Sequence, residues 1–108
     1  MSEQTSENPA AETGGHVVVR YWAAARAAAG VERDLLEVGA ETSLAEVLER
    51  VLLRHVDRPR FKDVVTVCSV LVGDQPVGTA DPGQVVVRPG ETVELLPPFA
   101  GGERASTR

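Results

Sequence analysis

The residues best suited to chemistry stand near the end of the sequence, where Gly101 and Gly102 follow Pro97, Pro98 and Phe99. Neither glycine has a Cβ atom, so this segment can become thin and extended and can enter a narrow channel without side-chain clashes. The two prolines favour an extended backbone that would direct the tail away from the fold. Phe99 is large enough to anchor the base of the tail in an apolar pocket of a partner.

Each of these residues also has a plain structural interpretation. A glycine pair by itself suits a flexible exit from a last strand. Pro97 and Pro98 suit a strand terminator, and Phe99 suits a position folded back onto the core. The tail therefore needs its surrounding sequence before it indicates a function.

The other reactive side chains form no catalytic or metal-binding pattern. Cys68 is the single cysteine, so one chain can form neither a disulfide nor a cysteine-based metal cluster. It stands in an apolar segment that we interpret as a buried strand, where cysteine behaves as a small hydrophobe rather than as a sulfur-relay thiol. His16 and His55 are far apart at the ends of predicted elements, and we expect surface or capping roles for them.

The charge of the chain argues against several classes of partner. Lys and Arg total 11 against 16 Asp and Glu, a formal charge of -5, so nucleic acid and anionic membranes have no support and a basic protein partner is favoured. A short basic cluster, interrupted by aspartates, is predicted to be a solvated loop; it comprises Arg54, Arg58, Arg60 and Lys62. The sequence shows neither a secretory signal nor an apolar run of bilayer length, and with its lone cysteine this favours the cytoplasm.

Hydrophobic periodicity predicts the elements that would position the tail. Strands are expected at residues 17–22, 32–38, 67–72, 85–87 and 92–96, and a turn at 73–74 is expected to lead into a short edge segment at 75–77. The alanine-rich residues 23–29, followed by Gly30, predict a short helix. Ser43 and Glu46 have capping-box spacing before an apolar stripe, so the principal helix is expected to begin at Thr42 or Ser43 and to end near His55.

This order of elements indicates an α+β fold in which one principal helix packs on a sheet. Hydrophobic residues make up 43% and charged residues 25%, as in an ordinary soluble globular protein. We expect a disordered N-terminal tail at residues 1–15, a folded domain at 16–100 and a flexible C-terminal tail at 101–108. Periodicity alone does not supply the order of the strands.

The segment from Pro89 to Gly102, PGETVELLPPFAGG, resembles the C-terminal signature of the small subunits of molybdopterin synthase. Residues 19–22 and the alanine-rich stretch after them resemble the first strand and helical turn of that family, and residues 71–77 resemble its central hairpin. These proteins are ubiquitin-like sulfur carriers. The resemblance therefore implies a β-grasp fold with a mixed sheet.

The resemblance also implies a non-catalytic role as a sulfur donor. In the family, an E1-like enzyme uses ATP to adenylate the carboxylate of the second glycine, which is then converted to a thiocarboxylate that supplies sulfur for molybdopterin. Gly102 would carry the reacting carbon and Gly101 would give access to the channel of the large synthase subunit, in an assembly with two copies of each subunit. ATP and the pterin belong to these partners, so no metal or cofactor is expected on this chain.

One feature departs from the family pattern, because Gly102 is followed by residues 103–108 instead of a free carboxylate. A carboxylate within a peptide bond cannot be adenylated, so we expect a processing peptidase to remove this extension; the alternative is loss of the carrier role. Three other functions stay open. They are a carrier for thiamin, cysteine or secondary-metabolite synthesis, a noncovalent β-grasp interaction module, and a ubiquitin-like modifier.

Overall fold

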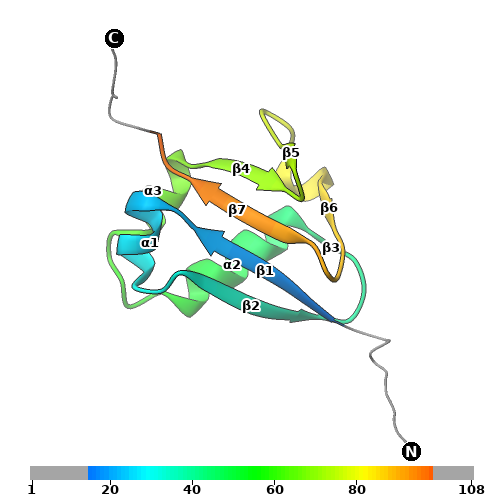
Figure 1. Cartoon of the computed structure of the whole chain (residues 1–108), viewed down its shortest axis with the longest axis horizontal. Helices are drawn as coiled ribbons and strands as arrows, with labels where there is room; N and C mark the ends of the chain where they lie inside the picture. The colour runs from blue at the N-terminus through cyan, green and yellow to red at the C-terminus, as the bar shows by residue number, and fades with distance from the viewer. Residues whose placement is uncertain (1–14, 99–108) are drawn as a thin grey trace, which may run out of the picture.

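The computed structural model describes residues 15–98, which form a mixed β-sheet with helices on one of its faces (Figure 1). In chain order the elements are β1 (Gly15–Tyr21), α1 (Ala23–Ala29), β2 (Arg33–Val38), β3 (Thr42–Ser43), α2 (Leu44–Arg54), α3 (Phe61–Val67), β4 (Ser69–Val72), β5 (Gln75–Pro76), the 3₁₀ turn η1 (Pro82–Gln84), β6 (Val86–Val87) and β7 (Thr92–Leu96). The α+β class expected from the sequence is confirmed.

The main sheet has five strands in the order β2-β1-β7-β4-β5. β1 and β7 run parallel, whereas the β1–β2, β4–β7 and β4–β5 pairs are antiparallel, so the sheet is mixed. The last strand of the chain therefore lies in the middle of the sheet. β3 and β6 form a separate two-stranded ladder in which Thr42 faces Val87.

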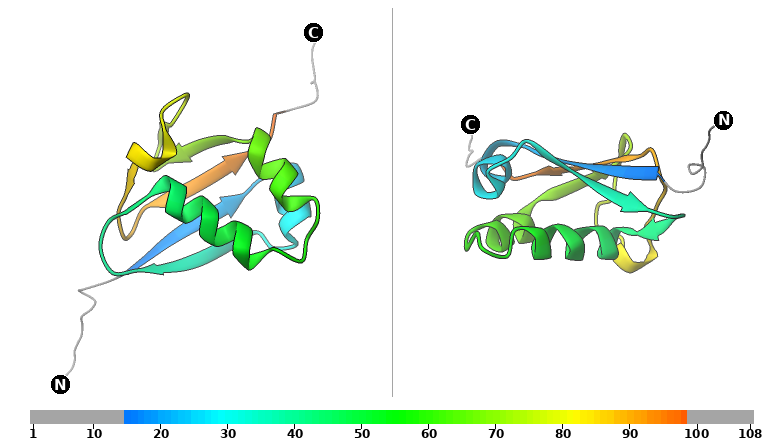
Figure 2. Two further views of the ribbon diagram at one scale, coloured as in Figure 1. Left: turned by 180° about the vertical axis from the view of Figure 1, so that it is seen from behind. Right: turned by 90° about the horizontal axis from the view of Figure 1, so that it is seen from below.

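The core lies between the sheet and α2. Alternate residues of the central strands point toward the helices and are buried, as period-two alternation requires; they are Val17, Val19 and Tyr21 of β1, and Val93 and Leu95 of β7. The apolar stripe of α2 meets them through Leu44, Val47 and Val51. The edge-on view in Figure 2 shows α2 and α3 on one side of the sheet, with no described helix across the other side.

The helix ends form where the sequence predicts them. α1 ends at Gly30, whose φ of 80° is the left-handed conformation that glycine adopts without strain. The hydroxyl of Ser43 accepts a hydrogen bond from the backbone N–H of Glu46 at 3.1 Å, which caps the start of α2. His55 is the C-cap of α2, so the principal helix has the expected length.

The structure corrects the interpretation of residues 54–68. α3 occupies Phe61–Val67, so Lys62 lies in a helix instead of a loop, and Val67 and Cys68 precede β4 instead of belonging to it. The reason is a tertiary contact: Phe61 is buried with its ring centroid 5.4 Å from that of Tyr21. β1 also begins one residue before the predicted domain boundary, at Gly15.

Candidate functional site

The candidate site is the end of β7, where the chain leaves the sheet toward the predicted glycine tail. β7 is held on both sides, because Leu95 faces Tyr21 of β1 and Leu96 faces Ser69 of β4. Pro97 is buried and Pro98 is exposed, so the chain emerges from the fold between these two residues. Phe99, Gly101 and Gly102, which the sequence singles out, lie outside the described residues.

An exposed aromatic side chain stands beside this exit. The backbone N–H of Trp22 donates to the carbonyl oxygen of Leu95 at 3.2 Å, which joins the end of β1 to the end of β7. The indole of Trp22 is 40% exposed, and the guanidinium carbon of Arg20 lies 4.8 Å from its ring centroid. Trp and Arg are the residue types that most often carry binding energy at protein interfaces. In sequence Trp22 is the last residue of an expected strand, and no local signal marks it as a binding residue.

The face of the sheet that points away from the helices continues this surface. Val18 faces Leu35 across the β1–β2 pair, and Leu35 is 54% exposed although it is a large apolar residue. Arg20 lies beside Glu94 in the parallel β1–β7 pair. We refer to Val18, Arg20, Trp22, Leu35 and Leu96 as the open sheet face. Trp22 and Leu96 lie at the exit of β7, whereas Val18 and Leu35 lie level with the start of that strand, because Val18 pairs with Thr92.

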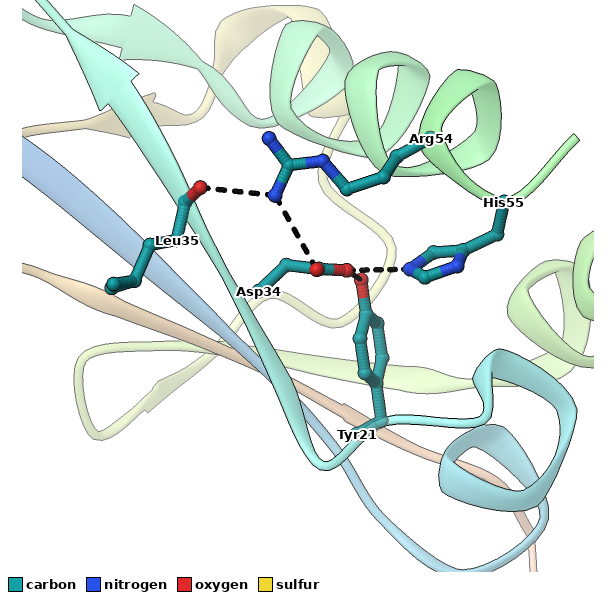
Figure 3. A network of polar contacts seen from close by, with 5 residues as sticks. All are labelled: Tyr21, Asp34, Leu35, Arg54 and His55. Atoms are coloured by element: carbon teal, nitrogen blue, oxygen red, sulfur yellow. Dashed lines mark hydrogen bonds and ion pairs between the residues drawn. The ribbon is translucent and has the colours of Figure 1, made fainter.

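A buried polar cluster ties the helices to the strands at this end of the fold (Figure 3). The carboxylate oxygen Oδ2 of Asp34 accepts a hydrogen bond from the Tyr21 hydroxyl at 2.6 Å and lies 2.6 Å from Nε2 of His55. Oδ1 of Asp34 accepts from Nη1 of Arg54 at 3.3 Å. One carboxylate from β2 thus joins the end of β1 to the end of α2.

The electrostatics of the cluster indicate a structural role. Burial acts to raise the pKa of Asp34, but hydrogen bonds from Tyr21, His55 and Arg54 outweigh it and hold the pKa below its ordinary value. Burial and the bond to Asp34 raise the pKa of Tyr21 well above its ordinary value. The carboxylate thus accepts from three side chains and the phenol is protonated at neutral pH, an arrangement that suits a structural joint.

The positions of the two histidines differ from each other. His55 caps α2 as expected, but its ring is buried, so the alternative of a surface position is wrong. The ring lies 4.9 Å from that of Phe61, and this aromatic contact closes the core around the Asp34 cluster. His16 is on the surface of β1, where Nε2 is 4.0 Å from a carboxylate oxygen of Glu37.

Cys68 lies near the exit but is not activated. It is the C-cap of α3, directly before the Ser69 that pairs with Leu96, and it is half-buried. Its thiol donates to the carbonyl oxygen of Val64 at 3.2 Å, and burial raises its pKa to about 11. A thiol with this pKa is almost wholly protonated at neutral pH and is a weak nucleophile. This supports the assignment of Cys68 as a packing residue.

The basic residues predicted to form one solvated loop instead lie in different elements and make separate contacts. Arg54 belongs to α2 and bonds Asp34, and Lys62 belongs to α3. The guanidinium of Arg58 packs on the end of α1: a Cβ atom added to Gly30 would lie 2.5 Å from its Cζ atom. Gly30 is favoured by its positive φ, and a side chain there would also displace the guanidinium of Arg58.

Two further classes of site can be addressed within residues 15–98. No three His, Cys, Asp or Glu side chains there lie together in an arrangement that could hold a metal ion. None of the helices in this part of the chain is long and apolar enough to cross a membrane.

Comparison with known proteins agrees with the fold and with the resemblance. No protein-family model matches the sequence. The chain is 26% identical over 86 residues to the molybdopterin synthase sulfur carrier subunit of Chlamydomonas reinhardtii, and the alignment covers 80% of this chain and 98% of that protein.

Similar solved structures include small archaeal modifier protein 1 from Haloferax volcanii, with a TM-score of 0.65, 19% identity and coverage of 82% of this chain and 100% of that one. A chain in the complex of subunits 1 and 2 of the molybdopterin-converting factor from Helicobacter pylori matches with a TM-score of 0.54 and 23% identity, covering 81% of this chain and 99% of that one. The ubiquitin-like β-grasp fold and the resemblance to molybdopterin synthase small subunits are thereby confirmed.

Proposed function

We propose that this chain is a sulfur carrier for molybdopterin synthesis, and that its working group is the carboxylate of Gly102 after the peptide bond to Glu103 is cleaved. The curated relative in Chlamydomonas reinhardtii is named as such a carrier, and the alignment spans almost all of it. The observation that carries the proposal is the exit of β7. A strand paired on both sides ends at Leu96, and Gly101 and Gly102 follow it after a Pro-Pro-Phe-Ala segment.

This arrangement suits delivery of a terminal group into a partner. The six residues from Pro97 to Gly102 span at most about 20 Å when extended, which is long enough to enter a channel while the β-grasp body stays outside. The two prolines limit the conformations of the base of this segment, so less entropy is lost when the tail is ordered. The glycines keep its end narrow.

The proposed chemistry takes place on the carbonyl carbon of Gly102. A carboxylate oxygen attacks the α-phosphorus of ATP on an E1-like enzyme, and pyrophosphate leaves. A sulfide equivalent then displaces AMP from the carbonyl carbon, which gives a thiocarboxylate. When that sulfur is donated to the pterin precursor on the large subunit, water supplies the oxygen that restores the carboxylate. The chain itself contributes the acyl group and no catalytic side chain.

The proposed partners would bind the open sheet face next to the exit. Trp22 and Leu96 offer apolar contact there, and Arg20 offers a charged one. In Helicobacter pylori, subunits 1 and 2 of the molybdopterin-converting factor form a complex, which supports a large-subunit partner for this chain. A peptidase that cleaves after Gly102 is the third proposed partner, and the cytoplasm is the proposed compartment because the lone thiol needs no oxidising environment.

The alternatives make different use of the same glycine. A carrier for thiamin, cysteine or a secondary metabolite would form the same thiocarboxylate but donate its sulfur to another acceptor. A modifier would transfer the adenylated Gly102 to an amine, and a noncovalent module would need no free Gly102. The fold accommodates all of these, as the likeness to small archaeal modifier protein 1 illustrates.

The test is ATP–pyrophosphate exchange by the cognate adenylating enzyme, with the full-length chain and with a chain that ends at Gly102. We expect exchange only with the shorter chain, because only its Gly102 carboxylate is free. A chain that ends at Gly101 is the matched control and should support little exchange. Equal exchange with the full-length and Gly102-terminated chains would remove the processing step from the proposal.

A further inference from the structure

The outer edge of β2 has a backbone that no described strand covers. β2 is the first strand in the order β2-β1-β7-β4-β5, and its six residues pair with β1 on one side only (Figure 1). An edge strand of this length presents unpaired N–H and C=O groups, and such an edge is a template for pairing with another chain. Its exposed Leu35 adds apolar surface to that template.

Two arginines of α2 reach across to this edge and bond its carbonyl oxygens. Nη1 of Arg50 donates to the carbonyl oxygen of Glu37 at 2.8 Å, and Nη1 of Arg54 donates to that of Leu35 at 3.1 Å. The arginines are four residues apart, one helical turn, and the two carbonyls are two residues apart along the strand. Figure 3 shows how Arg54 also contacts Asp34, which fixes its position.

The sequence of β2 is complementary to itself in an antiparallel arrangement. If two copies of β2 paired with Leu35 facing Leu35, then Arg33 of each copy would face Glu37 of the other. Opposite charges would meet on both sides of an apolar pair, which is the pattern that stabilises neighbouring strands. Such a pairing has twofold symmetry and would join two sheets edge to edge.

The arginine contacts and the self-complementary sequence both concern the outer edge of β2. We propose that the outer edge of β2 is a self-pairing strand for a second copy of this chain, and that Arg50 and Arg54 keep it closed. Their guanidinium groups occupy the carbonyl oxygens of Leu35 and Glu37, the acceptors that a second β2 would need. With the arginines in place the chain stays monomeric.

Sedimentation velocity over a concentration series tests this proposal with the full-length chain. We expect the native chain to be monomeric, and Arg50→Ala with Arg54→Ala to strengthen self-association by about tenfold or more. The matched control is Arg60→Ala with Lys62→Ala, which removes the same charge from the start of α3, away from the edge. This control should behave as the native chain does.

Adding Leu35→Lys to the double variant identifies the interface. Two lysines would then face each other at the centre of the paired strands, so the variant should return to a monomer. A folded double variant that stays monomeric overturns the proposal, and so does a dimer that persists with Leu35→Lys. If loss of the Arg54–Asp34 contact prevents folding, Arg50→Ala is measured alone, because it frees the Glu37 carbonyl without touching that contact. Self-association should then strengthen by a smaller factor, and a folded Arg50→Ala chain that associates no more than the native chain overturns the proposal.

Discussion

At Asp34 a single carboxylate joins its own strand, β2, to two other segments, the end of β1 and the end of α2. Its oxygens bond Tyr21 at the end of β1 and both Arg54 and His55 at the end of α2. A buried carboxylate of this kind is stable because donors compensate its lost hydration. The cluster therefore acts as a joint between the sheet and its principal helix, close to the exit of β7.

The lowered pKa of Asp34 predicts how acid acts on the fold. Because the folded-state pKa lies below the ordinary 3.8, this group stabilises the fold above that value and the contribution is lost as the pH falls through the folded pKa. Asp34→Asn should lower the free energy of unfolding at neutral pH by about 1–3 kcal/mol, because Arg54 and His55 lose a charged partner. Urea unfolding of the native chain and of Asp34→Asn, at neutral pH and below pH 3.8, measures the loss of stability in acid and the loss caused by the substitution.

The matched control is Asp63→Asn in the first turn of α3, away from the cluster. It should leave both the neutral stability and its decline in acid nearly unchanged. If Asp34→Asn instead kept the full acid dependence of the native chain, another carboxylate would be responsible for it.

Gly101 is the residue at which the proposed access to a channel is most easily tested. In a chain that ends at Gly102, Gly101→Val should reduce thiocarboxylate-dependent product formation by orders of magnitude, because the β-branched side chain restricts the backbone and widens the tail. The midpoint of thermal unfolding should barely move, since the position follows the last strand. Ala100→Val is a control that adds bulk before the glycine pair and should be less harmful. Normal turnover of Gly101→Val would favour the noncovalent module.

At the scale of elements, strands and the capped helix follow from local sequence, whereas α3 does not. The Ser43 cap, the stripe of α2 and the alternation of β1 and β7 are all local signals. Residues 64–67 read Val-Val-Thr-Val, which is β-branched and favours a strand. They are helical because Phe61 is buried against Tyr21 and His55, a contact between segments that periodicity does not relate.

At the candidate site too, local sequence signals do not reveal contacts between distant segments. Pro97 and Pro98 mark the end of β7 in sequence and in structure. The place of Trp22 beside the exit depends on the β1–β7 register, and the contact of Asp34 with His55 depends on the packing of α2 against β2; only the fold supplies these. The tail is therefore recognisable in the sequence, whereas the surface beside it is recognisable only in the structure.

The open sheet face gives a prediction about partner binding. Trp22→Ala should weaken binding of the Gly102-terminated chain to the large synthase subunit by about 2 kcal/mol or more, the scale of an interface hot spot. Leu53→Ala is the matched control, because Leu53 is 68% exposed on α2, the helix that covers the other side of the sheet (Figure 2). Isothermal titration calorimetry measures the affinity of each variant for the large subunit. Equal affinities for the two variants would place the partner on a different surface.

At the scale of the whole molecule, the described residues form one folded body that precedes the proposed sulfur-carrying tail. The described residues form one core around Tyr21, Phe61 and the central strands, and β7 passes through the middle of the sheet before the chain leaves it. A parallel β1–β7 pair brings the start of the fold beside its last strand, so the exit is held by elements from both ends of the sequence. The proposed sulfur group would be carried by that end alone.

The most direct measurement of the proposed function is the intact mass of the chain isolated from the cells that make it, grown while molybdopterin is being synthesised. We expect a chain whose last residue is Gly102, with a fraction heavier by the difference between one sulfur and one oxygen atom. A thiol-reactive alkylating reagent should rapidly add one group to the heavier fraction alone, at its thiocarboxylate, and should alkylate Cys68 slowly in both fractions. A chain that keeps residues 103–108 and carries no added sulfur would contradict the account.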